Sequence, residues 1–164
     1  MRVYFVRHAE AIERGGDVPD ALRYLTPEGR RFFRKTVKRL VEKGGLPDRI
    51  FSSPLARALQ TAEILAEGIG YRGTLVVTDK LAPGFGRAEL KALLSGCEGA
   101  KEVALVGHEP DLGDLVTSLL SRRDPFSLKK GEIVALELPR TGARSPAAFL
   151  WSAAGKRVVE QEKK

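Results

Sequence analysis

Two apolar runs in the sequence end in a histidine, and these are the only two histidines of the chain. The first run, "RVYFVRH", places Arg7 directly before His8, and the second, "EVALVGH", ends at His108. Arg57 lies in a third stretch, "SSPLARALQTAEI". A guanidinium binds phosphate through two parallel hydrogen bonds, and a neutral imidazole can act as a nucleophile. These residue types therefore predict chemistry on a phosphoryl group.

Each residue alone also has a structural interpretation, such as a strand end or a solvated helix position. If the side chains meet, however, one histidine can accept the phosphoryl group, and water can hydrolyse the resulting phosphohistidine. Nearby arginines favour the neutral imidazole that this attack needs. The other histidine can donate a hydrogen bond to a phosphoryl oxygen and stabilise the transition state. Because the arginines supply positive charge, we expect no metal and no cofactor, and two histidines with one cysteine are too few for a usual zinc site.

The surrounding patterns predict the elements that position these residues. Short β-rich runs and apolar residues at helical spacing alternate along the chain. Thr26 and Pro27 predict the start of one helix, and Ser53 and Pro54 predict the cap and first residue of the next. Strands are expected over 2–7, 49–53, 74–78, 102–107, 132–138 and 147–153, and helices from 26 to Gly44, from 53 to Gly68, and over 87–95 and 110–121.

This alternation predicts an α/β fold, a three-layer sandwich whose mostly parallel central sheet is flanked by helices. The last two strands are expected to form a hairpin across the "PRTGARSP" turn and add an antiparallel edge. Ligands bind beyond the carboxyl ends of strands in such sheets. Arg7, His8 and His108 follow two predicted strands and Arg57 lies one turn into a helix, so we expect all four at one edge.

Composition limits the alternatives. The 164 residues suit one domain, which we place at 1–155, followed by a solvated tail at 156–164. No apolar stretch approaches the roughly 20 residues of a membrane span. A single cysteine and the lack of a signal-like start favour the cytoplasm. The net charge of +7 lies mainly on polar helix faces without any nucleic-acid-binding motif, which argues against a nucleic-acid partner.

Three motifs resemble those of the histidine phosphatase superfamily, the phosphoglycerate mutase-like group. "VRHAE" resembles its Arg-His-Gly signature, "SSPLARALQTAEI" its second motif, and "VALVGHEPDL" the segment of its second histidine. With "YLTPEGR", the short chain most resembles the SixA-type phosphohistidine phosphatases over about residues 1–152. The resemblance implies a phosphoglycerate mutase-like fold and a metal-independent hydrolase. It makes His8 the nucleophile, Arg7 and Arg57 phosphate-binding residues, and His108 the stabilising, phosphate-binding histidine.

Two features depart from the family pattern. Ala9 replaces the glycine after the first histidine, so the loop there is expected to run slightly differently. Larger relatives use a carboxylic acid to protonate an alkoxide, and here Glu89 and Glu109 are the candidates, with Asp79 and Asp111 nearby in sequence. SixA-type relatives lack a dedicated acid, which suits a phosphoramidate because imidazole is a better leaving group than an alkoxide.

We therefore expect a phosphatase that works through a phosphohistidine at His8, with a phosphohistidine on another protein as its substrate. One alternative is a phosphatase for small phosphate esters that uses Glu89 or Glu109 as general acid. Another is a phosphate-binding or nucleic-acid-binding module without turnover. The short segments 9–25 and 79–100 predict a shallow site that admits a side chain of another protein. A mutase is less expected, because the short chain leaves little material to enclose a phosphorylated sugar acid and exclude water.

Overall fold

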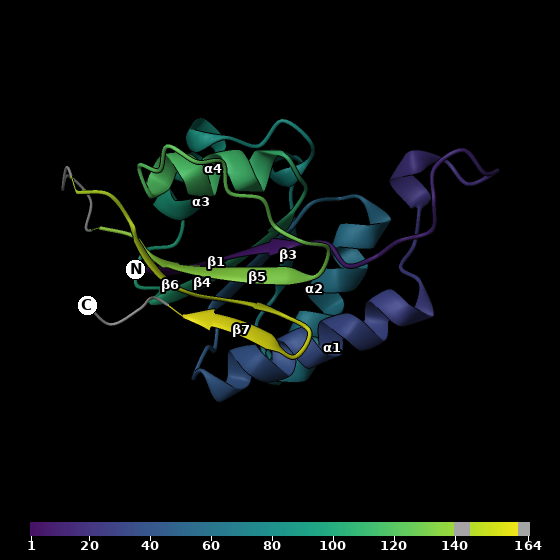
Figure 1. Cartoon of the computed structure of the whole chain (residues 1–164), viewed down its shortest axis with the longest axis horizontal. Coiled ribbons are helices and arrows are strands. Elements are labelled where there is room, and N and C mark those ends of the chain that lie inside the picture. Colours follow the sequence, from purple (N-terminus) through teal and green to yellow (C-terminus); the bar gives the residue numbers. More distant parts are fainter. Residues whose placement is uncertain (140–144, 161–164) are drawn as a thin grey trace.

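The protein, described from a computed structural model over residues 1–139 and 145–160, contains one seven-stranded sheet with helices on both faces (Figure 1). The strands are β1 (Arg2–Arg7), β2 (Arg49–Ser52), β3 (Leu75–Val77), β4 (Glu102–Gly107), β5 (Glu132–Glu137), β6 (Ala148–Ala154) and β7 (Arg157–Glu160). The helices are α1 (Pro27–Glu42), α2 (Ala56–Ile69), α3 (Arg87–Ser95) and α4 (Asp111–Leu119), with short 3-10 turns η1 (Asp20–Leu22) and η2 (Asp79–Leu81).

The strand order is β3-β2-β4-β1-β5-β6-β7. The first four strands of this order pair in parallel, and the remaining three join as antiparallel neighbours. The α/β class and the helix-covered central sheet are confirmed. The predicted hairpin forms as β5 and β6, while residues 140–144 of its "PRTGARSP" turn lie outside the described residues. The antiparallel part is one strand larger than expected.

Helices α1 and α2 cover one face of the sheet, and α3 and α4 cover the other (Figure 1). Along β1, Tyr4 and Val6 belong to the core beneath α1 and α2, whereas Val3 and Phe5 belong to the opposite core. All four are fully buried. A central strand with helices on both faces is apolar on both sides, which explains why this stretch reads as a continuous apolar run.

The starts of α1 and α2 differ in how well local sequence predicts them. The Thr26 hydroxyl accepts a hydrogen bond from the Gly29 amide at 2.9 Å, as expected for a helix cap. Helix α2 instead begins at Ala56, so the predicted Ser53-Pro54 start is wrong by two residues. Ser53 lies in the turn before the helix, where its hydroxyl contacts His108. Its position reflects the site rather than helix capping.

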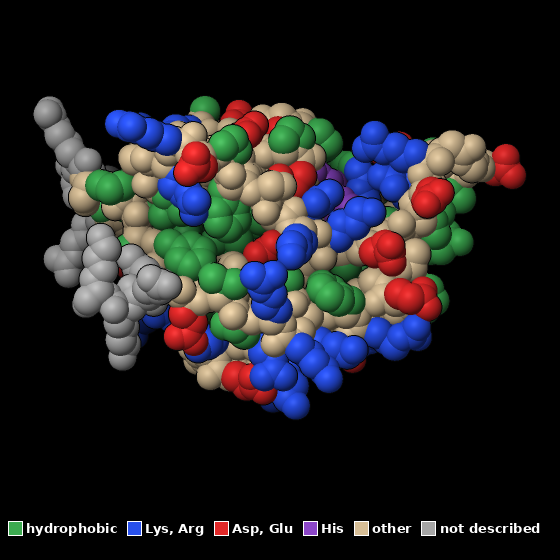
Figure 2. Space-filling model, in the orientation of Figure 1, with side chains coloured by type: hydrophobic (Ala, Val, Ile, Leu, Met, Phe, Trp, Pro, Cys, Tyr) green, Lys and Arg blue, Asp and Glu red, His purple; other side chains and the backbone are tan. Residues whose placement is uncertain are grey.

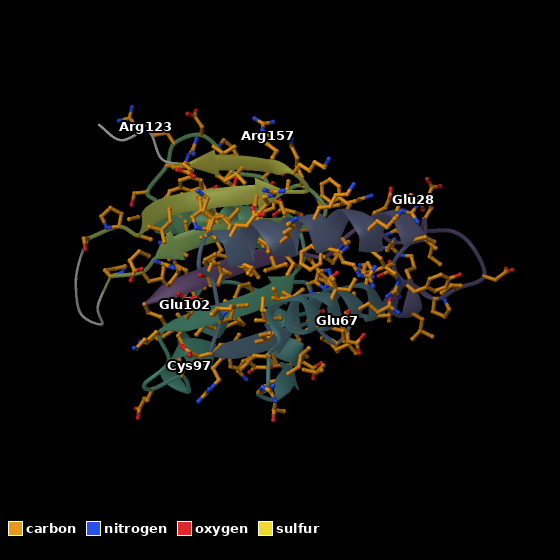
Figure 3. The ribbon with its side chains drawn as sticks, turned by 90° about the horizontal axis from the view of Figure 1, so that it is seen from below. Glu28, Glu67, Cys97, Glu102, Arg123 and Arg157 are labelled. Carbon is orange, nitrogen blue, oxygen red and sulfur yellow. The ribbon has the colours of Figure 1, made fainter. Side chains whose placement is uncertain are left out.

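The predicted tail also needs correction, because Arg157–Glu160 form the edge strand β7. Gly155, at a φ of +61°, makes the tight turn that folds this strand back onto β6. Figure 3 shows Arg157 on this strand, which forms the edge of the sheet opposite to the edge formed by β3. Most of β7 is exposed, which explains why its sequence resembles a solvated tail. Residues 161–164 lie outside the described residues.

Figure 3 also shows the polarity of the molecule, with Glu102 at the start of β4 and Glu28 at the N-terminus of α1 toward opposite ends. The carboxyl ends of the parallel strands and the N-termini of the helices therefore share one end. Across the described residues, none of the helices combines the length and the apolar character needed to span a membrane.

Thr36, fully buried in α1, joins this helix to two turns of the sheet. Its hydroxyl donates to the Gly131 carbonyl at 2.9 Å and accepts from the Gly155 amide at 2.8 Å. We expect Thr36→Val to lower the free energy of unfolding by about 1–3 kcal/mol, because the isosteric side chain leaves two buried backbone groups unpaired. Urea unfolding measures this change, with Thr36→Ser as the matched control that keeps the hydroxyl. A Thr36→Val protein as stable as Thr36→Ser would contradict this account.

Candidate active site

The pairing of β1 with β4 brings the two histidines together. Arg7 lies opposite Gly107 in the parallel register, so His8 and His108 leave adjacent strand ends. The His8 amide donates to the Gly107 carbonyl at 3.1 Å, which extends the ladder by one residue. The centroids of the two imidazole rings lie 5.3 Å apart, with 53° between the ring planes. Both side chains are buried.

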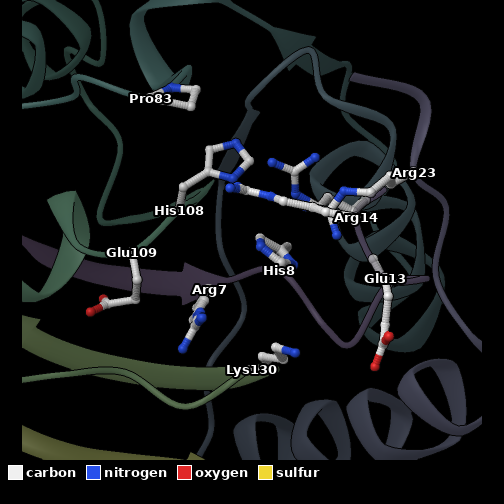
Figure 4. A pocket seen from close by; sticks show the side chains of 11 residues that line it. Arg7, His8, Glu13, Arg14, Arg23, Pro83, His108, Glu109 and Lys130 are labelled. Atoms are coloured by element: carbon white, nitrogen blue, oxygen red, sulfur yellow. The ribbon is translucent and has the colours of Figure 1, made fainter. Parts of the chain in front are cut away.

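Arg7 and Arg57 complete the group, so the structure brings together all four residues that the sequence singled out. They line one pocket of about 380 Å³ at the carboxyl edge of the sheet (Figure 4). Arg57 reaches it from the first turn of α2 and is almost fully buried. The pocket is lined by Arg7, His8, Ala11, Glu13, Arg14, Arg23, Arg57, Pro83, His108, Glu109 and Lys130.

The hydrogen bond of His8 determines which ring nitrogen is free to react. Nδ1 of His8 lies 2.7 Å from the Ala9 carbonyl oxygen. A carbonyl can only accept a hydrogen bond, so Nδ1 must carry the proton. In the neutral ring the lone pair is then on Nε2. The backbone therefore selects the tautomer in which Nε2 can attack an electrophile.

His108 is held by a different partner. Its Nε2 lies 2.7 Å from the Ser53 hydroxyl oxygen, and this hydroxyl also accepts a hydrogen bond from the Leu55 amide at 3.3 Å. When the Ser53 hydroxyl donates to Nε2, the proton of neutral His108 is on Nδ1. Nδ1 is buried and has no hydrogen-bond partner among the described residues. In that tautomer, Nδ1 is the nitrogen left to donate a hydrogen bond.

Both imidazoles are neutral at physiological pH. Burial is the main cause that lowers the pKa of His8 to about 3, and the charges of His108, Arg57 and Arg7 add to it against the opposing Ala9 hydrogen bond. Burial, followed by the charge of Arg57, lowers the pKa of His108 to about 4. Sequence reasoning identified the arginines as a cause but did not identify burial as the larger one.

Each guanidinium is fixed by a backbone carbonyl. Arg7 Nη1 donates to the Leu128 carbonyl at 2.7 Å, and Arg57 Nη1 donates to the Asp20 carbonyl at 2.9 Å. The Nε atoms of both arginines are buried without a hydrogen-bond partner among the residues described. Burial lowers the pKa of Arg57, against the opposing charge of Asp20, but a guanidinium stays protonated in proteins. Two oriented cations thus have donors left for an anion.

Asp20, in η1, is a site residue that sequence reasoning missed. Its carboxylate lies 2.9 Å from Arg23 Nε, 3.2 Å from Arg14 Nε and 3.5 Å from Arg57 Nη2. Partial burial opposes ionisation, but the Arg23 hydrogen bond and the charges of all three arginines lower the pKa of Asp20. A segment expected as an irregular loop therefore carries the carboxylate that gathers three arginines beside the pocket. No local pattern in the sequence indicates this role, because the segment is about as rich in charged residues as the rest of the chain.

Two neighbours of Arg57 on α2 hold the loop that follows β1. The Thr61 hydroxyl accepts a hydrogen bond from the Ala9 amide at 3.0 Å, and the Gln60 side-chain oxygen accepts one from the Leu25 amide at 2.8 Å. Ala9 is fully buried in the core and does not have a positive φ, so no glycine is needed there. The "RALQT" segment thus positions both the cation and the histidine loop.

The candidate general acids lie in different environments. Glu109 lines the pocket, but its carboxylate points away from the histidine pair in Figure 4, and the Ser127 hydroxyl donates to it at 3.3 Å. Burial raises the pKa of Glu109. Glu89 accepts from the Gly86 amide at 3.0 Å, and Asp111 accepts from the Gly84 amide at 2.6 Å. Glu89, Asp79 and Asp111 are not among the residues that line the pocket.

The arrangement can bind a tetrahedral anion, attack it from His8 Nε2 and donate to it from His108. A metal ion would need other ligands, because residues 1–139 and 145–160 contain no group of three or more His, Cys, Asp or Glu side chains placed to hold one.

Comparisons with known proteins agree with this geometry. Residues 3–91 match the family model of the histidine phosphatase superfamily (branch 1). An uncharacterised protein of Picosynechococcus is 36% identical over 148 residues, covering 87% of each chain. Phosphohistidine phosphatase SixA of Escherichia coli is 28% identical over 146 residues, covering 87% of this chain and 88% of its own.

The structure of the protein histidine phosphatase SixA complexed with tungstate superposes with a TM-score of 0.83 at 25% identity, over 94% of this chain and 97% of that chain. The fold, the match to the family model and the sequence identity agree, and the chain belongs to branch 1 of the histidine phosphatase superfamily.

Proposed function

We propose that the protein is a phosphatase that forms a covalent phosphohistidine on His8, and that its substrate is a phosphohistidine on another protein. The observation that carries the proposal is the 2.7 Å contact of His8 Nδ1 with the Ala9 carbonyl, which leaves the Nε2 lone pair free beside two arginines and His108. The coarser assignment to phosphoryl chemistry rests on family membership.

In the first step, His8 Nε2 forms a bond to phosphorus while the bond from phosphorus to the substrate nitrogen breaks. A substrate imidazole that is protonated on its other nitrogen leaves as a neutral ring. His8 then becomes a phosphorylated imidazolium, because Nδ1 keeps its proton. The Ala9 carbonyl, which accepts that proton's hydrogen bond, stabilises the positive charge of the intermediate. Arg7, Arg57 and His108 stabilise the charge on the phosphoryl oxygens.

In the second step, water forms a bond to phosphorus and the bond to His8 Nε2 breaks. The electron pair of that bond returns to Nε2, so His8 leaves as the same neutral tautomer that began the cycle. The proton lost by water goes to phosphate or solvent. No acid is required for this leaving group, since the imidazolium becomes neutral as it departs.

The positions of the carboxylates support a phosphoramidate rather than an alkyl phosphate as substrate. An alkoxide leaving group needs a proton donor, whereas the Glu109 carboxylate points away from the histidines and Glu89 is engaged with the Gly86 amide. The name of the Escherichia coli relative, a phosphohistidine phosphatase, supports the same substrate class. The tungstate bound by the SixA relative is a tetrahedral oxyanion, like the phosphoryl group proposed here.

The first prediction concerns the covalent intermediate. After acid-free rapid quenching of a reaction with a labelled aryl phosphate, we expect an acid-labile, base-stable phosphoryl group that maps to His8. His8→Ala should lack the label and lose at least about 10³-fold in kcat/KM, because the nucleophile is gone. His108→Ala should still be labelled, about 10²-fold more slowly. A wild-type protein that is neither labelled nor active would instead support the phosphate-binding module without turnover.

The second prediction concerns protonation. Because the pKa values of His8 and His108 are lowered to about 3 and about 4, both rings stay neutral as pH falls until well below the ordinary histidine range. With only two histidines in the chain, NMR of the imidazole carbons resolves both. We expect neither resonance to titrate between about pH 5.5 and about pH 8, whereas both should titrate near 6.5 in urea. A midpoint near 6.5 in the folded protein would contradict the neutral pair.

The third prediction separates the two substrate classes. We expect kcat/KM for phosphohistidine to exceed that for simple alkyl phosphates by at least about 10²-fold, the usual contribution of a general acid. Glu109→Gln and Glu89→Gln should each leave phosphohistidine hydrolysis within about threefold of the wild type, since neither carboxylate is used. Fast alkyl phosphate hydrolysis that depends on either carboxylate would favour the small-ester phosphatase.

A further inference from the structure

The cations around the histidines extend beyond the catalytic pocket. Arg7 and Arg57 already match the roughly two negative charges of a phosphoryl group. Arg14 and Lys130 add cations at the exposed rim of the same pocket, and the side chain of Arg14 is 76% exposed. Figure 2 shows Lys and Arg side chains gathered around the histidine and continuing across this face toward α1. Arg14 is paired with Asp20 at 3.2 Å, whereas Lys130 forms no ion pair among the described residues, so Lys130 is the rim cation that a further negative charge on the substrate can reach.

A second depression of about 420 Å³ adjoins the pocket, because Lys130 lines both. Its other basic residues, Arg31 and Lys35, lie one helical turn apart on α1. Within the described part of the chain, Lys35 and Lys130 form no ion pair. These two cations are therefore available to an acidic partner.

Phe32 gives the second depression a fixed apolar surface. The ring packs on Gly131 and Gly155, where an added Cβ would lie 3.1 Å and 2.7 Å from its atoms, yet the residue is 39% exposed. The Gly131 amide donates to the His8 carbonyl at 3.1 Å. The backbone that supports the aromatic ring is thus bonded directly to the residue that would carry the phosphoryl group.

The depression also contains Glu10 and Glu28, and these select between partners. Glu28 pairs with Arg31 at 2.8 Å, and Glu10 accepts a hydrogen bond from the Thr26 hydroxyl at 3.2 Å. Two carboxylates beside an aromatic ring do not suit the evenly spaced charges of a nucleic-acid backbone. They suit a polypeptide, which can set an apolar side chain on Phe32 and a carboxylate against Lys35 and Lys130 while neutral residues face Glu10 and Glu28.

We propose that Lys130, Lys35 and the exposed face of Phe32 form the docking surface for the substrate protein. The segment that it accepts is acidic and partly apolar, and it flanks the phosphohistidine that enters the catalytic pocket. This inference rests on the proposed function and specifies its substrate. A small phosphorylated metabolite would fill the pocket without reaching Phe32 or Lys35, so this surface would contribute nothing to its binding.

The experiment compares three substrates phosphorylated on histidine with phosphoramidate. These are free phosphohistidine, a peptide whose phosphohistidine is flanked by glutamates and a leucine, and the same peptide with glutamines in place of the glutamates. We expect kcat/KM for the acidic peptide to be about tenfold above that for the glutamine peptide, through KM rather than kcat. The difference should shrink between about 0.1 M and about 1 M salt, because exposed charges are screened.

Lys35→Glu tests the surface, and Lys38→Glu is the matched control. Lys38 is on the same helix but lines a separate depression between α1 and α2. Lys35→Glu should lower kcat/KM for the acidic peptide by about fivefold and leave free phosphohistidine within about twofold, while Lys38→Glu changes neither. Thermal unfolding checks that both variants fold.

The failures of the two proposals are distinguishable. Equal kcat/KM for the two peptides, or equal effects of the two lysine variants, would overturn the docking surface while hydrolysis of phosphohistidine still stands. Competition by a single-stranded oligonucleotide that Lys35→Glu abolishes would also overturn it, by assigning the surface to nucleic acid. If none of the three substrates is hydrolysed, the proposed function itself is wrong.

Discussion

The parallel pairing of β1 with β4 is the constraint on which the site depends. The pairing of Arg7 with Gly107 sets the next residue of each strand, His8 and His108, side by side. Side chains alternate between the faces of a sheet, so a slip of one residue would turn one imidazole away from the other. The packing of both strands holds this register, because their apolar residues are fully buried in the two cores.

Burial of the imidazoles determines their chemistry. A histidine in water is partly protonated near neutral pH, and a protonated ring has no lone pair for attack. Here burial is the largest cause of the lowered pKa of both histidines, and the arginines add to it. The positive charge of the site therefore stays on the guanidiniums, whose pKa is too high for them to lose it. The carboxylate of Asp20, which is itself exposed, offsets part of the repulsion among these cations.

The sequence predicts the parts of the structure that local chemistry determines. Apolar runs predict the strands, Thr26 predicts the start of α1, and the motifs single out the four residues that share the pocket. The contacts of Asp20 and Ser53 could not be predicted, because they join segments far apart in the chain through side-chain geometry. Ser53-Pro54 has the composition of a helix start, but the Ser53 hydroxyl contacts His108 and the helix begins at Ala56. Edge strand β7 has too few buried residues to show an apolar pattern.

The two arginines show why the site needs guanidiniums rather than ammonium groups. In both Arg7 and Arg57, a backbone carbonyl occupies Nη1, and Nε is left without a partner among the described residues. Nε and Nη2 form one edge of the planar group, and two donors on one edge match two oxygens of a phosphoryl group. In Arg57, Nη2 also lies 3.5 Å from the Asp20 carboxylate. A lysine anchored by a carbonyl would keep its charge but lose this paired geometry. The anchoring carbonyls therefore set the direction in which each guanidinium presents its remaining donors, in addition to holding the cation in place.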